Sequence, residues 1–320
     1  TEHSSYLMGL AADGILTHIY HGKRVDEAPE LSGVYTDKIM KAFSAAYDKE
    51  YPGITTAGIY QEYPTFGSTD YRTPALKVEY ADGTKITRLV YEGHRIYSGK
   101  PSLRGLPAVY AHSEGEAQTL EITLKDKYSD MSVVLLYSVI KGFDAIMRSA
   151  EIVNGGTERI KLHSALSASL DCYNSGFELT YLSGTWARER HIKKIPVSFG
   201  NFVLDSKRGA SSHILNPFMA MSDKGADERR GEVYGFSLVY SGNFTAGAEA
   251  DDDSVRMYMG INPFDFCWML EPGDSFQTPE AVLVYSDSGF GEMSRTYHRL
   301  YRTRLCRGKY RDAARPVLIN

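Results

Sequence analysis

Apolar and polar residues alternate with a period of two along most of this 320-residue chain, a pattern typical of half-buried β-strands. In residues 75–97 two alternating runs flank the dipeptide Asp82-Gly83, which predicts a β-hairpin. Residues 117–140 repeat this arrangement around a turn at 128–130. The second run there, MSVVLLYSVI, is apolar enough to predict burial on both faces.

Further alternating runs extend the strand pattern to most of the chain. One pair lies around residues 154–156, and later runs occupy 231–244, 254–261, 265–270 and 280–287. Turn residues recur about every 8–15 positions, with no long helical pattern between them. This spacing predicts a mainly β fold, a large antiparallel β-sandwich, rather than alternating β-α-β units.

Two segments have a helical period instead. Residues 289–308 predict an amphipathic helix with a stop at Gly308, and its apolar positions are Met293, Tyr297, Leu300, Tyr301 and Leu305. Residues 36–53 predict a short helix or an ordered loop. The last six residues, RPVLIN (315–320), place three branched apolar residues after a proline, which predicts the start of a buried strand.

Composition and charge narrow the class of protein. With 42% hydrophobic and 24% charged residues, the chain can bury a substantial core. A net charge of −4 gives no field for a polyanion, so no nucleic-acid partner is expected. No apolar run has the length of a membrane span and the N-terminus shows no signal pattern, so no membrane partner is expected. Three widely spaced cysteines without a CxxC motif predict thiols in a reducing cytoplasm rather than disulfides or a zinc site.

Two patterns could suggest a metal site, and both favour another explanation. His18 and His21 stand three apart in a strand pattern, where their side chains would point to opposite faces and could not easily share one ion. The three aspartates at 251–253 fit a solvated loop better than a calcium site. The sequence therefore predicts no metal ligands.

Carboxylates are harder to dismiss, because glycoside hydrolysis needs only two of them at a set separation. Asp70, Glu189 and Asp265 all lie among aromatic and basic residues. Each could instead be the partner of an arginine that holds a loop in place. The pattern alone does not pair any two of them as acid and nucleophile.

Residues 61–75, QEYPTFGSTDYRTPA, are the best candidate for a binding loop. Proline and glycine punctuate a segment dense in aromatic and charged residues, namely Glu62, Tyr63, Phe66, Asp70, Tyr71 and Arg72. Aromatic rings and charged hydrogen-bonding groups on a rigid loop are what sugar recognition uses. A tightly packed structural loop would use the same residue types, so both interpretations stay open.

Several blocks of the chain, taken in order, resemble the N-terminal region of bacterial glycoside hydrolase family 36 α-galactosidases. They include QEYPTFGSTDYRTPA, HRIYSGKPSLRGLPAVY, GTWARERH, SKRGASSHILNPFMAM, GINPFDFCWML and MSRTYHRLYRTRL. The resemblance runs from about residue 6 to residue 320 and is weakest at 25–58. Such collinearity is far more specific than any single motif.

The resemblance implies a domain organisation. Residues 1–288 would form the N-terminal sandwich, of the supersandwich type, and residues 289–320 a linker helix and the first strand of a (β/α)₈ catalytic barrel. In this family both catalytic aspartates lie on later barrel strands. The resemblance therefore implies no catalytic residue, metal or organic cofactor in this chain, which would be inactive alone.

The resemblance also implies a reaction and a partner. The whole enzyme would hydrolyse terminal α-galactosides such as raffinose and melibiose with retention, through a covalent galactosyl-enzyme and carboxyl groups about 5 Å apart. Members of this type are commonly tetramers in which loops of this region reach a neighbouring subunit's pocket. Residues 61–75, and with them 36–53, would then rim that pocket, with Trp186 as a further candidate. The competing hypothesis is a stand-alone carbohydrate-binding or oligomerisation sandwich.

Overall fold

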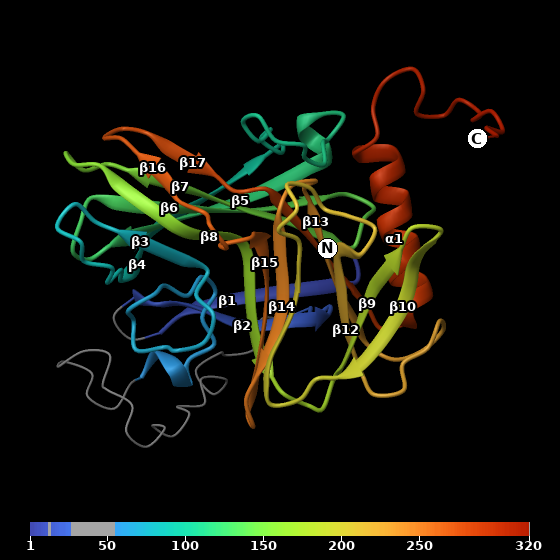
Figure 1. Cartoon of the computed structure of the whole chain (residues 1–320), viewed down its shortest axis with the longest axis horizontal. Helices are drawn as coiled ribbons and strands as arrows, with labels where there is room; N and C mark the ends of the chain where they lie inside the picture. Colours follow the sequence, from blue (N-terminus) through green and yellow to red (C-terminus); the bar gives the residue numbers. More distant parts are fainter. Residues whose placement is uncertain (12–13, 27–54, 320) are drawn as a thin grey trace.

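The computed structural model describes residues 1–11, 14–26 and 55–319, and its strands form three antiparallel sheets (Figure 1). The smallest is a hairpin of β1 (Ser4–Leu10) and β2 (Leu16–Lys23). The ten-stranded sheet has the order β10-β9-β12-β13-β18-β7-β6-β5-β4, with β17 also paired to β7. The six-stranded sheet has the order β11-β14-β15-β8-β16, with β3 also paired to β8. The mainly β, antiparallel fold predicted from the alternation is thus confirmed.

The bounds of the strands follow the alternating runs closely. Those of the ten-stranded sheet are β4 Leu89–Ser98, β5 Ala117–Asp126, β6 Met131–Ile140, β7 Ala145–Asn154, β9 Glu178–Thr185, β10 Arg188–Pro196, β12 Leu215–Ser222, β13 Val233–Val239, β17 Ser275–Gln277 and β18 Glu280–Ser286. Those of the six-stranded sheet are β3 Leu76–Glu79, β8 Ile160–Tyr173, β11 Gly200–Asp205, β14 Phe244–Ala250, β15 Ser254–Ile261 and β16 Trp268–Leu270. Two short 3₁₀ helices, η3 (Thr56–Gly58) and η4 (Glu114–Glu116), interrupt the loops.

The two larger sheets pack face to face over the main hydrophobic core. Strand β18 shows how the alternation serves this core, because Ala281 and Leu283 face inward between the sheets while Val282 and Val284 face outward under the C-terminal helix. Both faces of β18 are therefore buried. In β6, by contrast, burial alternates from Met131 to Tyr137, and residues such as Val134 are only half-buried. The prediction that β6 is buried on both faces is wrong for this reason.

One predicted hairpin is present and one is not. β5 and β6 pair directly across the turn at 128–130, as expected. The chain also turns at Asp82-Gly83, where the Tyr80 amide donates to the Thr84 carbonyl at 2.9 Å. However, β3 pairs with β8 and β4 pairs with β5, so this turn carries the chain from one sheet to the other. A turn signal is local, whereas the choice of strand partner depends on the whole sandwich.

The predicted amphipathic helix is confirmed as α1 (Gly289–Arg304), which packs on the outer face of the ten-stranded sheet. Tyr297 is buried in this contact, and its hydroxyl donates to the Val282 carbonyl at 2.9 Å. Gly235 makes room for it, since a Cβ there would lie 2.8 Å from the Tyr297 ring. The helix ends before the predicted stop at Gly308, whose φ of +81° places it in a later turn. Among the described residues, no helix combines the length and apolar character of a membrane span.

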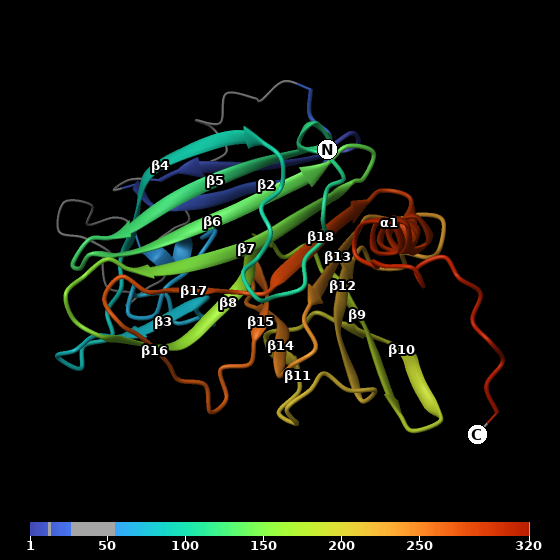
Figure 2. The same ribbon diagram turned by 90° about the horizontal axis from the view of Figure 1, so that it is seen from above.

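The segment after α1 does not form the buried strand that its apolar pattern predicts. Val317, Leu318 and Ile319 are 95%, 88% and 91% exposed, and they belong to no strand. Figure 2 shows this segment leaving α1 and extending away from both sheets. An apolar sequence becomes a buried strand only beside a partner strand, and the described residues provide none here. The helix or ordered loop predicted at 36–53 lies outside the described residues.

Candidate functional site

The candidate loop, residues 61–75, lies between η3 and β3 and is fixed to the sandwich by two clusters of buried charges. It is found in the cyan part of Figure 1, next to the β1–β2 hairpin. One cluster lies between the sheets and centres on Glu62. The other lies on the outer face of the six-stranded sheet and centres on Asp70.

The inner cluster, formed by Tyr6, His18, Glu62, Tyr137 and Arg148, places one ion pair in the sandwich interior. The Glu62 Oε1 atom lies 2.8 Å from the Arg148 guanidinium, and it accepts hydrogen bonds from Tyr6 at 2.5 Å and Tyr137 at 2.7 Å. His18 Nδ1 lies 3.2 Å from Oε2. Burial alone would raise the pKa of Glu62, but Arg148 and the hydrogen bonds outweigh it and hold the pKa at about 2. The carboxylate therefore stays ionised and is fully enclosed.

The rings of His18 and His21 both lie beside the ring of Tyr6, although the alternation of side chains along a strand predicted opposite faces for them. Tyr6 lies 4.8 Å from the His18 ring and 5.2 Å from the His21 ring, between centroids. The β1–β2 register shifts at this point, pairing Leu7 with Tyr20 but Met8 with His18. This bulge adds one residue and so turns both histidines to one face. The prediction of opposite faces is wrong, yet no group of three or more potential ligands that could hold a metal ion occurs among the described residues.

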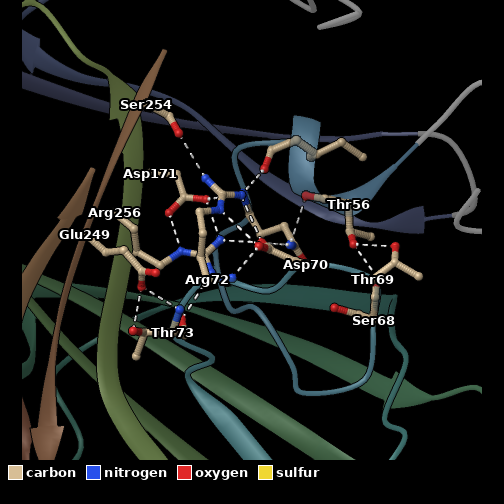
Figure 3. A network of polar contacts seen from close by, with 12 residues as sticks. Thr56, Ser68, Thr69, Asp70, Arg72, Thr73, Asp171, Glu249, Ser254 and Arg256 are labelled. Carbon is tan, nitrogen blue, oxygen red and sulfur yellow. Dashed lines mark hydrogen bonds and ion pairs between the residues drawn. The ribbon is translucent and has the colours of Figure 1, made fainter. Parts of the chain in front are cut away.

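The outer cluster, formed by Asp70, Arg72, Asp171 and Arg256, joins the loop to strands β8 and β15 (Figure 3). Arg256 Nη2 lies 2.7 Å from Asp70 Oδ2, and its Nε lies 2.7 Å from Asp171 Oδ1. Arg72 reaches the same two carboxylates, at 2.9 Å and 3.4 Å. Two cations thus balance two anions. Burial opposes ionisation of Asp70, but Arg256 and Arg72 together lower the pKa of its carboxyl group.

Further hydrogen bonds fix the loop on either side of Asp70. The Thr73 amide and hydroxyl both donate to Glu249 Oε2, each at 2.6 Å. On the other side the Thr56 hydroxyl donates to the Ser68 carbonyl and lies 3.1 Å from the Thr69 hydroxyl. Thr69 has a φ of +67°, an uncommon backbone conformation that these contacts hold. The loop therefore has one defined shape.

Gln61 connects the two clusters. Its amide N–H donates to Asp171 Oδ2 at 3.2 Å, and its side-chain Nε2 donates to Asp70 Oδ2 at 2.8 Å. The next residue, Glu62, belongs to the inner cluster. A single stretch of chain thus links the interior of the sandwich to the outer face of the six-stranded sheet.

The structure divides the predicted loop residues into buried anchors and exposed rings. Glu62 is 0%, Tyr63 4% and Asp70 7% exposed, and the Tyr63 hydroxyl donates to the Leu166 carbonyl. Their side chains are used within the chain and offer no surface to a sugar. Arg72 is likewise engaged with aspartates. The rings that reach the surface are Phe66, 40% exposed beneath the Lys77 ammonium, and Tyr71, 85% exposed.

Trp186 and Glu189 are not brought to this loop. Trp186 is 84% exposed in the turn between β9 and β10, a hairpin that lies across the molecule from the loop (Figure 1). Glu189 is the second residue of the return strand β10 and accepts a hydrogen bond from the Ala187 amide at 2.9 Å. Asp265 lies in the connection after β15, with a φ of +56°. Asp70 and Glu189 therefore cannot form a catalytic pair within one chain.

Sequence reasoning missed Arg148, Asp171 and Arg256, the strand residues that hold the loop. Each is a charged residue inside a run that is otherwise apolar or small, and each is now found buried. Charged residues are rarely buried without a partner. A charged residue within an apolar strand pattern could therefore have indicated a buried ion pair. The partners themselves lie 86 to 186 positions away in the sequence, which no local pattern reveals.

Comparison with known proteins places these features in a family. A family model described as the glycosyl hydrolase family 36 N-terminal domain matches residues 14–271, and one described as melibiase matches residues 275–320. Alpha-galactosidase AgaA of Geobacillus stearothermophilus is 49% identical over 318 residues, which are 99% of this chain and 43% of that protein. Alpha-galactosidase Mel36A of Lactobacillus acidophilus is 36% identical over 99% of this chain and 43% of its own length.

Solved structures agree with the sequence comparison. The crystal structure of AgaA superposes with a TM-score of 0.94 and 48% identity over 98% of this chain and 44% of that one. Variants of AgaA were solved in complex with stachyose and with raffinose. An α-galactosidase structure from Lactobacillus brevis gives a TM-score of 0.95 at 36% identity. The chain spans less than half the length of these relatives, and it belongs to glycoside hydrolase family 36, of whose α-galactosidases it is the N-terminal portion.

Proposed function

We propose that this chain is the non-catalytic N-terminal region of an α-galactosidase that hydrolyses terminal α-galactosides with retention. The observation that carries the proposal is the match over 99% of the chain to α-galactosidases of which it covers 43%. Raffinose and stachyose, found in complexes of a close relative, are the substrate type we expect for the whole enzyme. The catalytic aspartates would belong to the barrel region, outside these 320 residues.

The chain's own role would be to shape the substrate pocket of a neighbouring subunit in a cytoplasmic homo-oligomer, a tetramer as is common in the family. Phe66 and Tyr71 are the residues of the loop with exposed rings, so they would contact the sugar. Glu62, Asp70 and Arg72 would act indirectly, by fixing the loop in one position. Trp186 lies on the far hairpin and would serve a different neighbour.

The division into residues 1–288 and 289–320 belongs to the same proposal. α1 begins at Gly289, directly after the last strand of the ten-stranded sheet. It would act as the link between the sandwich and the barrel. Its buried face, which includes Met293 and Leu300, would hold the two parts in a fixed orientation.

The assignment of catalysis to a region outside these residues is tested by assaying p-nitrophenyl α-galactoside with two proteins. One is the 320-residue chain, and the other is the protein encoded by the complete reading frame. We expect turnover by the second and none above background by the first. Turnover by the 320-residue chain itself would overturn the proposal, as would a complete reading frame that ends at Asn320.

A further inference from the structure

A pocket of about 400 Å³ lies on the six-stranded sheet beside the anchored loop, and the proposed function does not use it. We call it the Phe264 pocket and define it by Thr73, Asp205, Lys207, Tyr258, Asn262 and Phe264. Thr73 belongs both to the loop and to this pocket, whereas the remaining residues come from β11, β15 and the segments that follow them. The volume is within the range of small-ligand sites.

One wall of the pocket is an aromatic ring held open to solvent. Phe264 is 63% exposed, and a hydrogen bond holds its backbone. Its amide donates to Asn262 Oδ1 at 2.9 Å, and Asn262 Nδ2 in turn donates to the Ser206 carbonyl at 3.1 Å. The Lys207 ammonium lies 5.0 Å from the ring centroid. This wall of the pocket thus offers an apolar ring to a ligand beside polar groups, as small-ligand sites do.

Charged groups lie at the edge of this ring. Lys207 Nζ lies 2.9 Å from Asp205 Oδ2, and Asn262 Nδ2 lies 3.4 Å from the same oxygen. Both contacts use Oδ2, which leaves Oδ1 of Asp205 as an acceptor. Neither side chain of the pair is fully buried, at 48% and 31% exposed for Lys207 and Asp205. The pair therefore offers a donor and an acceptor side by side.

The floor of the pocket is fixed by its own hydrogen bonds. Asn201 Nδ2 donates to the Thr73 hydroxyl at 3.0 Å, and the Tyr258 hydroxyl donates to Asn201 Oδ1 at 3.0 Å. Tyr258 is 3% exposed, so its ring does not move aside without disturbing the sheet. The pocket is thus preformed, and a ligand would bind without ordering the loop.

We propose that the Phe264 pocket is a non-catalytic binding site for a neutral hexopyranoside. The C–H face of a pyranose ring packs on Phe264, and two neighbouring hydroxyls bond to Asp205 Oδ1 and the Lys207 ammonium. The Asp205–Lys207 pair has no net charge and so favours a neutral ligand, and a purely apolar ligand would leave the pair without solvent. This site goes beyond the proposed function, because it binds sugar in this chain whether or not the barrel is present.

The test measures sugar binding to the 320-residue chain by saturation-transfer NMR and calorimetry, with galactose, melibiose and raffinose as probes. We expect weak binding, with Kd on the order of 1 mM, and a loss of about tenfold or more in Phe264→Ala and in Asp205→Asn. The matched control is Tyr128→Ala, which removes an equally exposed ring at the β5–β6 turn. This control should bind like the parent chain.

Three outcomes would overturn the proposal. The first is no binding of any probe at about 50 mM, a concentration well above the expected Kd. The second is binding that Phe264→Ala leaves unchanged, because the sugar would then sit elsewhere. The third is an oligomer that Phe264→Ala dissociates in light scattering, because a second copy of the chain would then cover the ring. Melting curves of the variants confirm that each is folded, and none of these results depends on hydrolytic activity.

Discussion

The two charge clusters hold adjacent parts of one loop, yet they have different surroundings. The inner cluster encloses the Glu62–Arg148 pair between the sheets, where Tyr6 and Tyr137 satisfy the carboxylate. The outer cluster lies on the far face of the six-stranded sheet, directly before the exposed Tyr71. We infer that the inner cluster mainly determines whether the sandwich folds. The outer cluster mainly determines where the exposed part of the loop lies.

The largest effect should come from breaking the inner cluster. Arg148→Met leaves the Glu62 carboxyl group buried without its cation, which costs about 3–5 kcal/mol of the free energy of unfolding. Urea unfolding followed by circular dichroism measures this loss. The control is Arg95→Ala, which breaks the solvent-exposed Arg95–Glu121 pair and should leave the midpoint almost unchanged. Equal losses of unfolding free energy in the two variants would show that the buried ion pair contributes no more to stability than the exposed one.

Breaking the outer cluster should cost less stability but release the loop. Asp70→Asn removes one carboxylate between two arginines and is expected to cost about 1–3 kcal/mol. Hydrogen exchange of the amides at 67–73 should accelerate strongly, while exchange in β6 and β18 stays slow. Uniform acceleration across the sandwich would contradict a local role for the outer cluster.

His21, whose ring packs on Tyr6 of the inner cluster, should make stability depend on pH. Burial, with His18 and Arg148 nearby, lowers the pKa of His21 to about 3 from an ordinary value of 6.5. As pH falls, the unfolded chain takes up this proton first, so the folded state loses stability from about pH 6.5 downward toward pH 3. His21→Phe should flatten the melting temperature between pH 6.5 and pH 5, whereas His213→Phe, at an exposed site, should not. If the melting temperature falls with pH equally in the parent chain and in His21→Phe, His21 is not the source of the pH dependence.

The smallest effect on stability is expected for the loop's exposed ring. Tyr71 is 85% exposed, so Tyr71→Ala should leave the unfolding midpoint within error of the parent chain. The same measurement on Tyr63→Phe should show a loss, because the buried Tyr63 hydroxyl donates to the Leu166 carbonyl. A large destabilisation by Tyr71→Ala would mean that this ring serves the fold.

Much of the fold could be predicted from the sequence, because strands and the helix α1 each leave a periodic trace. The Asp82-Gly83 turn was found from its residue types, but the strand pairing was not, since β8, the partner of β3, lies far along the chain. His18 and His21 share one face of the hairpin because a β-bulge inserts one residue. A bulge leaves no periodic pattern in the sequence, so it could not be predicted.

The candidate loop shows the same limit. Its aromatic and charged composition was visible, and so was the choice between a binding loop and a structural one. The structure shows the anchoring role for Asp70 and leaves the ring of the next residue, Tyr71, exposed, so the binding role of the loop stays a proposal. The composition of a segment does not tell which of its side chains is buried. Here that depends on partners far along the chain, Arg256 and Asp171, which form the buried cluster with Asp70.

The central proposal is that this chain holds a loop in one position, so that its exposed ring Tyr71 contacts the sugar in the pocket of a neighbouring subunit. Its most direct test is the KM for raffinose of the protein from the complete reading frame, with Tyr71→Ala compared with Tyr128→Ala, a ring exposed at another turn. We expect Tyr71→Ala to raise KM about tenfold, the effect of losing about 1.4 kcal/mol of binding, and Tyr128→Ala to leave it unchanged. Equal KM values for the two variants and the parent enzyme would contradict the claim.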